Sequence, residues 1–187
     1  DYTSTSSLDL PAPNPGDLVK RDTSGRARGV TVVGNYAYVA DGASGLAIID
    51  ISDPTSPGTP VYMDTNEYAW DVTVVGNYAY VADDSFGLAI IDISDPTSPG
   101  TPVYKDTSGY SYSVTVAGNY AYVADEDSGL AIIDISDPTN PGAPVYKEIS
   151  GWASGVTVVG NYAYVADYTS GLAIIDISDP TSPGTPV

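Results

Sequence analysis

A 42-residue repeat organises this chain. The segment Gly-Asn-Tyr-Ala-Tyr-Val-Ala-Asp begins at Gly34 and returns at Gly76, Gly118 and Gly160, so the spacing is 42 residues each time, with no insertion or deletion. A fixed period of about 20 to 50 residues is typical of solenoids, propellers and other arrays, in which each unit buries its apolar surface against its neighbours. The repeat therefore restricts the fold to an architecture of four similar units.

Each repeat reads as four short β-strands. In the first copy, residues 30–33 and 36–40 flank the pair Gly34-Asn35, which is typical of a hairpin turn. Residues 46–51 begin as an apolar run, as expected of a strand covered on both faces. A proline-rich stretch follows, and a more polar strand resumes at residues 61–65. Four short strands per unit indicate one blade of a β-propeller.

We therefore predict an all-β fold, a β-propeller of four 42-residue, four-stranded blades over residues 19–187, preceded by a Ser/Thr/Pro-rich N-terminal arm at residues 1–18. The two ends are complementary, because residues 19–23 align with the outer strand of a blade and the last copy stops at Val187, where its outer strand is due to begin. We expect the N-terminal strand to complete the last blade, within the same chain or from a neighbouring subunit. The remaining interpretation is that the chain is a piece of a longer array.

The candidate assembly residues lie at this end of the chain. Leu8 and Leu10 alternate across a polar residue in the arm and suit an extended segment on a sheet edge. Val19 and Thr23 bound the strand that would be exchanged.

The repeated phrases resemble a known family. Gly-Leu-Ala-Ile-Ile-Asp-Ile-Ser-Asp-Pro and Asn-Tyr-Ala-Tyr-Val-Ala-Asp are similar to the LVIVD repeat, and the resemblance extends over residues 19–187. It implies a β-propeller and an extracellular or cell-surface location. It implies no activity, because that family carries no catalytic motif to transfer.

Differences between the copies are confined to two connections. One lies at residues 24–29 and the equivalent positions of later copies, and the other begins at Asp41 and its equivalents. In an up-and-down blade both emerge on one face, where propellers usually bind partners. The candidate binding residues of this face are Arg26, Arg28, Tyr68, Trp70, Phe86, Tyr110, Tyr112, Trp152 and Tyr168. Three roles are open for them: packing between blades or in the channel mouth, a subunit interface, or a glycan or peptide site.

Composition excludes several classes of function. Six Lys+Arg against 24 Asp+Glu give a formal charge of −18, which disfavours nucleic acid and anionic membranes as partners. The chain has no Cys and no His, so the usual general base and the commonest transition-metal ligands are missing. No apolar stretch approaches the ~20 residues of a membrane helix, so we expect no membrane insertion. We expect the protein not to be an enzyme, because the acidic residues recur in all four repeats and nothing distinguishes two of them as a catalytic pair.

The repeated carboxylates allow a cation site or a structural role. An Asp-Ile-Ser-Asp-Pro motif recurs in every copy, but its spacing is not that of a calcium loop and favours Asx-turns. Asp125 and Asp127 are nearer to a Ca²⁺ loop, yet they stand in one copy alone. The sequence therefore predicts no cofactor, with Ca²⁺ as the one candidate ion.

Two functional hypotheses follow. The first is a non-enzymatic extracellular structural protein, a propeller subunit that self-assembles with copies of itself into a surface polymer or filament through its arm or through strand exchange. The alternative is a cell-surface adhesion or binding module that recognises a glycan or a cell-surface protein through the aromatic loop face.

Overall fold

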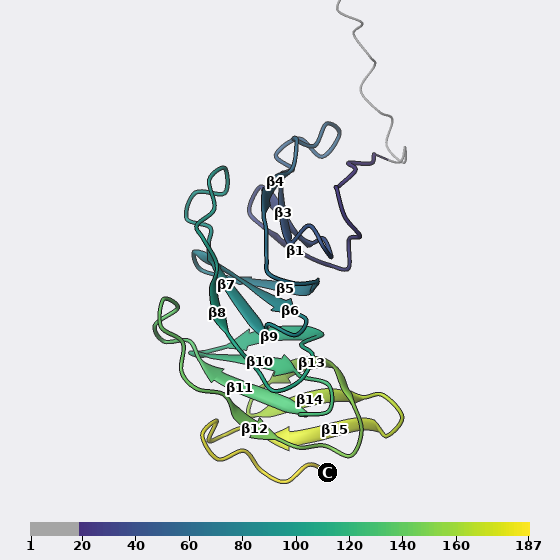
Figure 1. The fold of residues 1–187 in the computed structure, drawn as a ribbon, viewed down its shortest axis with the longest axis vertical. Helices are drawn as coiled ribbons and strands as arrows, with labels where there is room; N and C mark the ends of the chain where they lie inside the picture. Colours follow the sequence, from purple (N-terminus) through teal and green to yellow (C-terminus); the bar gives the residue numbers. More distant parts are fainter. Residues whose placement is uncertain (1–18) are drawn as a thin grey trace, which may run out of the picture.

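A computed structural model describes residues 19–187, which form four antiparallel β-sheets arranged in a row (Figure 1). Leu8 and Leu10, the assembly residues expected in the arm, lie outside the described residues. Within the described part of the chain every element is a strand, so no helix there is long or apolar enough to cross a membrane. The all-β, four-bladed propeller architecture is confirmed.

Each sheet is a meander that follows one 42-residue repeat, and we number the sheets blades 1 to 4 in chain order. Blade 1 contains β1 (Gly29–Val33), β2 (Tyr36–Ala40), β3 (Leu46–Asp50) and β4 (Val61–Met63). Blade 2 contains β5 (Ala69–Val75), β6 (Tyr78–Asp83), β7 (Leu88–Asp92) and β8 (Val103–Lys105). Blade 3 contains β9 (Ser113–Ala117), β10 (Tyr120–Ala124), β11 (Leu130–Asp134) and β12 (Val145–Lys147), and blade 4 contains β13 (Ala153–Val159), β14 (Tyr162–Asp167) and β15 (Gly171–Asp176).

Local sequence explains the turns of each blade. Gly34, with a φ of +56°, provides the left-handed conformation that the tight β1–β2 turn requires. In the proline-rich loop, Asp50 Oδ1 accepts the backbone N–H of Ser52 at 2.8 Å, and Asp53 Oδ1 accepts that of Thr55 at 2.9 Å. These bonds recur in all four blades, so the Asp-Ile-Ser-Asp-Pro motif closes Asx-turns, as the sequence favoured.

The core lies between blades. We call the face that a blade turns to the following blade its leading face, and the opposite one its trailing face. At the first junction Tyr38, Ala40, Leu46 and Ile48 of the leading face of blade 1 meet Ala69, Val72, Ala79, Val81, Ala89, Ile91 and Ile93 of the trailing face of blade 2. The same positions form the second and third junctions. Burial of both faces explains why the third strand is apolar on each side.

Backbone bridges tie the blades together at one edge. Gly42 pairs with Ala69, Asp84 with Ser111, and Glu126 with Ala153, so that the loop after the second strand of one blade meets the start of the next blade. Two polar contacts each occur at a single junction of the described blades. The Thr31 hydroxyl of blade 1 donates to the Val72 carbonyl of blade 2 at 2.8 Å. Asp71 Oδ2 of blade 2 accepts the Ser113 hydroxyl at 2.8 Å and the Val114 N–H at 3.1 Å of blade 3.

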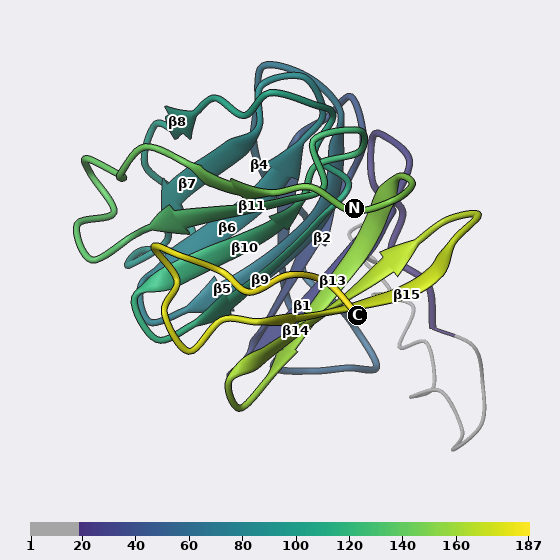
Figure 2. The same cartoon turned by 90° about the horizontal axis from the view of Figure 1, so that it is seen from below.

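The four sheets are rotated relative to one another, as the view along the row shows (Figure 2). Inner strands of consecutive blades pack in order, β1 with β5, β5 with β9 and β9 with β13. Among the described residues, no hydrophobic cluster joins blade 4 to blade 1. The blades therefore form an arc with two ends, and blades 1 and 4 lie at opposite ends of it (Figure 1).

The expected strand closure does not form within this chain. Blade 4 is a three-stranded sheet, and residues 19–23 form no strand. Thr23 instead donates its hydroxyl to Asp41 of blade 1 at 2.7 Å, and the Arg21 guanidinium donates to the Pro57 carbonyl of the same blade. Held at blade 1, this segment lies at the far end of the arc from β15.

The last residue begins the outer strand of blade 4. The Val187 N–H donates to the Ile174 carbonyl at 3.1 Å, and the Ile174 N–H donates back to the Val187 carbonyl at 3.0 Å. Val187 thus occupies the place opposite Ile174 that Val61 occupies opposite Ile48 in blade 1. This agrees with the register expected from the sequence.

Candidate functional site

The variable connections lie side by side along one edge of the arc, which we call the loop edge. The inter-blade bridges hold them there, because each joins a connection of one blade to a connection of the next. The loop edge consists of residues 24–28, 41–45, 64–68, 84–87, 106–112, 125–129, 148–152 and 168–170 with the first residues of the adjoining strands. The structure brings some of the nine candidate binding residues together there and separates others.

Four of the candidates form one cluster that crosses three blades. The Arg28 guanidinium lies 4.7 Å from the centre of the Trp70 ring and 5.3 Å from that of Tyr68. Trp70 meets Tyr112 edge to face at 5.2 Å, and its indole N–H donates to Asp84 at 2.8 Å. The cluster therefore links neighbouring blades, and cation–π and polar contacts within the cluster hold its rings in place.

A second pair is open to solvent. Trp152 and Tyr168 of blade 4 are stacked, with ring centres 5.8 Å apart and an angle of 22° between the ring planes. They are 49% and 70% exposed, and they line a shallow hollow with Ser150, Gly151 and Thr169. Two adjacent exposed rings are the kind of surface on which a sugar or an apolar side chain stacks.

The other three candidates do not join either group. Phe86 meets Tyr104 of its own blade edge to face at 6.0 Å, and Arg26 is exposed beside Tyr68 in a hollow of blade 1. Tyr110 is half exposed and has no aromatic neighbour among residues 19–187. The nine residues therefore make two groups and three separate side chains, not one continuous site.

A buried aspartate lies under the loop edge of each blade, at Asp41, Asp83, Asp125 and Asp167. Asp125 is the most fully bonded: it accepts the Thr107 hydroxyl at 2.6 Å, the Gly109 N–H at 2.9 Å and the Ser111 hydroxyl at 3.0 Å. Sequence reasoning missed this role, although a threonine 18 residues upstream recurs in three of the four copies. The fourth copy has Ile149 at that place, and Oδ1 of Asp167 is buried without a donor.

Burial changes the titration of one of these acids. Desolvation raises the pKa of Asp83, whose Oδ1 lacks a hydrogen-bond donor. No group of three or more His, Cys, Asp or Glu side chains in the described residues is arranged to hold a metal ion. Of the two Ca²⁺ candidates, Asp125 accepts hydrogen bonds from three protein groups through its carboxylate, and Asp127 is exposed.

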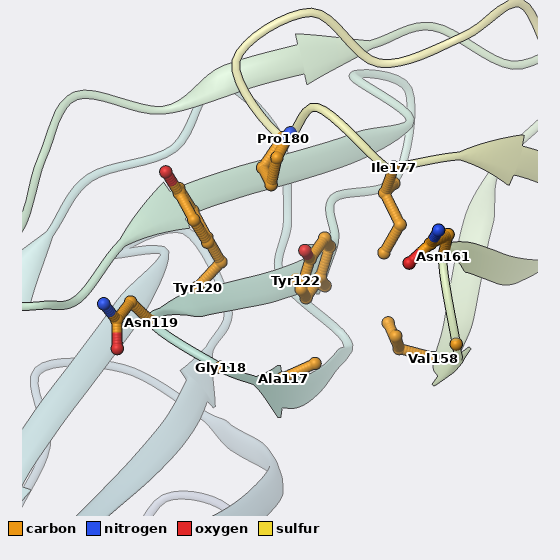
Figure 3. A pocket seen from close by; sticks show the side chains of 10 residues that line it. Ala117, Gly118, Asn119, Tyr120, Tyr122, Val158, Asn161, Ile177 and Pro180 are labelled. Carbon is orange, nitrogen blue, oxygen red and sulfur yellow. The ribbon is translucent and has the colours of Figure 1, made fainter.

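A further hollow lies at the opposite edge, between blades 3 and 4 (Figure 3). Ala117, Val158 and Ile177 lie around the Tyr122 ring, with Tyr120 and Pro180 to one side. Ala117 stands where the other three copies have the larger valine. Tyrosines are the only titratable groups in its wall, so it offers no acid and base pair for catalysis.

The leading face of blade 4 is an apolar surface with no blade on it. Leu172 is 57% exposed, whereas Leu46, Leu88 and Leu130 at the same position are fully buried at 0%. Part of this exposure comes from the missing outer strand, because Leu46 is paired with Met63. The residues of this face are Tyr164, Ala166, Leu172 and Ile174.

The trailing face of blade 1 is uncovered at its inner strand. Val30 is 64% exposed, whereas Val72 at the same position of blade 2 is 2% exposed. Ala27 is exposed, although its equivalent Ala69 is buried in an inter-blade bridge. The rest of this face is not open: Val39, Ala47 and Ile49 are 8%, 0% and 6% exposed, and Ala37 and Ile51 pack against them.

Sequence reasoning also missed these two faces. The signal was available, because the end units of an array that buries its faces between neighbours each lack one neighbour, and capping units usually have a polar outer face. Here the residues of the end faces match those of the internal junctions.

Comparison with known proteins bears on the fold. The model of the LVIVD repeat matches residues 24–65, 67–103, 108–143 and 150–185. No match was found among curated proteins. Solved structures with a similar fold were also found. The computationally designed Ika4 protein has 8% identity and a TM-score of 0.63, with 82% of this chain and 92% of that chain covered.

The computationally designed Ika8 protein has 9% identity and a TM-score of 0.66, with 82% of this chain and 46% of that one covered. The Cps50 (Swd1) β-propeller domain of Myceliophteria thermophila has 12% identity and a TM-score of 0.66, with 87% of this chain and 55% of that one covered. The chain thus spans about half the length of the last two structures.

Proposed function

Because the chain belongs to the LVIVD repeat family and the leading face of blade 4 is an uncovered apolar surface, we propose that it is a non-enzymatic structural protein that assembles with copies of itself. The observation that carries the proposal is the contrast at Leu172, which is 57% exposed where its three equivalents are fully buried. Exposed contiguous apolar surface marks an interaction site.

The identity of the exposed residues supports a second copy of the chain as the partner. The leading face of blade 4 presents the tyrosine, alanine, leucine and isoleucine that blades 1 to 3 bury against the next blade. A surface of this shape fits the trailing face of another blade, and in a second copy the inner strand of blade 1 is open on that face, with Val30 64% exposed.

The charge of the chain sets the conditions of assembly. A formal charge of −18 on each copy opposes association at low ionic strength, and added salt screens this repulsion. The location that we propose, extracellular or at the cell surface, rests on the family resemblance.

Light scattering coupled to size exclusion, over a range of protein concentrations, tests self-assembly. We expect the parent chain to exceed its single-chain mass of 19.3 kDa and the Leu172→Asp variant to remain at it. Leu172 is exposed in the single chain, so the variant should fold. Val75→Asp is the matched control, because it places the same charge on an exposed valine of an internal blade. A parent chain that stays single at every concentration, or a Leu172→Asp variant that assembles normally, contradicts the proposal.

A second candidate function is adhesion, and the exposed stack of Trp152 and Tyr168 supports it. In this function the loop edge of blade 4 binds a glycan or a cell-surface protein. A glycan array with the parent chain, repeated with Trp152→Ala, provides the test, and Tyr110→Ala removes a similarly exposed ring elsewhere on the loop edge. Binding that Trp152→Ala abolishes and Tyr110→Ala preserves supports it, whereas binding that survives both variants places the site elsewhere.

A further inference from the structure

The loop edge contains a basic hollow at the junction of blades 1 and 2. Its volume is about 430 Å³, and it is lined by Ser24, Gly25, Arg26, Ala43, Ser44 and Tyr68. We infer that this hollow binds an acidic sugar, that is, a sugar ring that carries one carboxylate. The hollow is separate from the stack of Trp152 and Tyr168 and from the apolar face of blade 4, so the inference goes beyond both functions proposed above.

Hollows at the same place in other blades differ from this one in charge. The hollow of blade 3, of about 290 Å³, has the two equivalent serines but also contains Asp127 and Glu148. The hollow of blade 4, also of about 290 Å³, is lined by the rings of Trp152 and Tyr168. Of these three hollows, that of blade 1 has a basic residue and no carboxylate in its lining. Blade 1 thus offers positive charge where blade 3 offers negative charge, and this selects an anion.

The backbone fixes Arg26 at the hollow. The Arg26 N–H donates to the Asp41 carbonyl at 3.2 Å. The buried Asp41 carboxylate accepts the Gly25 N–H at 2.8 Å and the Thr23 hydroxyl at 2.7 Å, so the segment that carries Arg26 is held to blade 1. Within residues 19–187 the Arg26 guanidinium forms no ion pair. Its planar set of N–H donors is therefore available to a carboxylate, which it fits with two parallel hydrogen bonds.

Tyr68 adds an oriented hydroxyl beside Arg26. The Nε and one terminal nitrogen of Arg28 donate to the Tyr68 hydroxyl oxygen at 3.3 and 3.2 Å. Because this oxygen accepts from Arg28, its own proton points away from that residue, and it has no acceptor among the described residues. The charge of Arg28 also makes the hydroxyl a stronger donor. The Tyr68 hydroxyl can therefore donate to the carboxylate that Arg26 binds.

A glycine allows the Tyr68 ring to lie at this place. Gly42 has a φ of +61°, and a Cβ added to it would lie 2.7 Å from Cζ of Tyr68 and 2.8 Å from its hydroxyl oxygen. The other copies have Asp84, Glu126 and Tyr168 at this position. The close approach of ring and backbone thus requires the glycine of the first copy, and the hydroxyl is placed by residues that the other copies lack.

The rest of the lining favours a sugar as the carrier of the carboxylate. Ser24 and Ser44 bring two hydroxyl groups to the hollow, and these can exchange hydrogen bonds with the hydroxyls of a sugar. The Tyr68 ring provides a flat apolar surface for the C–H face of a sugar ring. A volume of about 430 Å³ lies within the usual range for small-molecule sites, about 300 to 1,000 Å³.

The charge of the whole chain limits the ligand to one negative charge. A formal charge of −18 repels polyanions such as nucleic acid. At physiological ionic strength, exposed charges more than about 8 Å apart are largely screened from each other. A single carboxylate in the hollow therefore interacts mainly with Arg26 and with Arg28, which touches Tyr68 of the lining.

Titration calorimetry with methyl β-D-glucuronide tests the inference. Methyl β-D-glucoside is the matched ligand, because it has the same ring with a hydroxymethyl group in place of the carboxylate. We expect the glucuronide to bind about tenfold or more tightly than the glucoside, since one hydrogen bond between charged groups contributes at least this factor. Equal binding of the two sugars, or no binding of the glucuronide, overturns the inference.

Variants of the lining locate the ligand. Arg26→Gln and Tyr68→Phe should each weaken glucuronide binding about tenfold, and both should fold, because Arg26 is exposed and the phenylalanine keeps the ring. Lys147→Gln is the matched control, since it removes the same charge from the outer strand of blade 3 and should keep the affinity of the parent. Glucuronide binding that survives both lining variants, or that falls equally in Lys147→Gln, overturns the site.

Two further measurements separate the inference from its neighbours. Trp152→Ala should leave glucuronide binding unchanged, and a loss of binding in this variant would move the ligand to blade 4 and support the adhesion function proposed above instead. N-acetylglutamate α-amide presents a carboxylate on a peptide side chain without a sugar ring. We expect it to bind more weakly than the glucuronide, and equal affinity would assign the hollow to an acidic protein side chain and overturn the sugar.

Discussion

The junction between blades 3 and 4 and the free end of blade 4 contain the same residues in different surroundings. Leu130 and Leu172 lie in identical segments, Gly-Leu-Ala-Ile-Ile-Asp-Ile-Ser-Asp-Pro, yet one is fully buried and the other is 57% exposed. In a repeat protein each unit contacts only its neighbours, so the contribution of a residue depends on its place in the array. The comparison teaches that residue type alone does not separate core from interface here.

Truncation of the two leucines should give the largest difference. Leu130→Ala removes a fully buried side chain at an internal junction and should cost about 2 to 5 kcal/mol of unfolding free energy. Leu172→Ala should cost about 0.5 kcal/mol or less in the single chain, because more than half of its surface is already exposed to water. Urea unfolding followed by tryptophan fluorescence, at a dilution that keeps the chain single, measures both. Equal losses would mean that blade 4 is covered in solution even under these conditions.

Neutralising the buried aspartates should give an intermediate difference. Asp125→Asn keeps one acceptor oxygen for three donors and should cost about 1.5 to 3 kcal/mol. Asp167→Asn places an amide where Oδ1 has no donor, so it should change stability by about 0.5 kcal/mol or less. The same urea titrations compare the two variants. A large loss from Asp167→Asn would show that this carboxylate is bonded in a way that the structure does not contain.

Changes to the aspartates of the proline-rich outer loops should have the smallest effect on stability. The effect should be the same in blade 3 as in blade 4. The Ser136 N–H lowers the pKa of Asp134, and the Ser178 N–H lowers the pKa of Asp176 in the same way. A lowered pKa in the folded state stabilises the protein above the unfolded pKa of about 3.9, and this contribution is lost as the pH falls through the folded value.

Urea midpoints at pH 6 and pH 3 test this. The parent should lose more stability between these pH values than Asp134→Asn or Asp176→Asn, and the two variants should behave alike, because both groups are exposed Asx-turn acceptors. If the loss of stability differs more from the parent for Asp134→Asn than for Asp176→Asn, the contribution of an outer loop also depends on the position of its blade in the array.

Much of the fold follows from the sequence because its determinants are local and repeated. The Gly34-Asn35 turn, the alternation in residues 36–40 and the prolines after Asp50 specify the strands and their order without reference to distant residues. The register of the ends also follows, as the bonds between Val187 and Ile174 show. These features depend on turn chemistry and periodicity, which one chain contains in full.

The candidate site could be predicted only in part. The loop edge followed from the topology of the blade, but the contacts of Arg28 with Tyr68 and Trp70 depend on the distance and angle between blades. The place of residues 19–23 was open for the same reason, since sequence periodicity does not report whether four blades complete a circle. Side-chain clusters and closure both depend on the rotation at each junction, which no local pattern encodes.

The contact of Asp71 with Ser113 and Val114 bears on how the chain acquires its order during synthesis. Because the apolar faces of the four units are nearly interchangeable, a newly made unit can dock on the wrong neighbour or on a unit of another nascent chain, a typical failure of repeat proteins. Asp71 has no counterpart in the other units, where glycine or serine stands at that place. Its bonds to Ser113 and Val114 therefore stabilise the pairing of the second unit with the third, and a wrong pairing of units forfeits them.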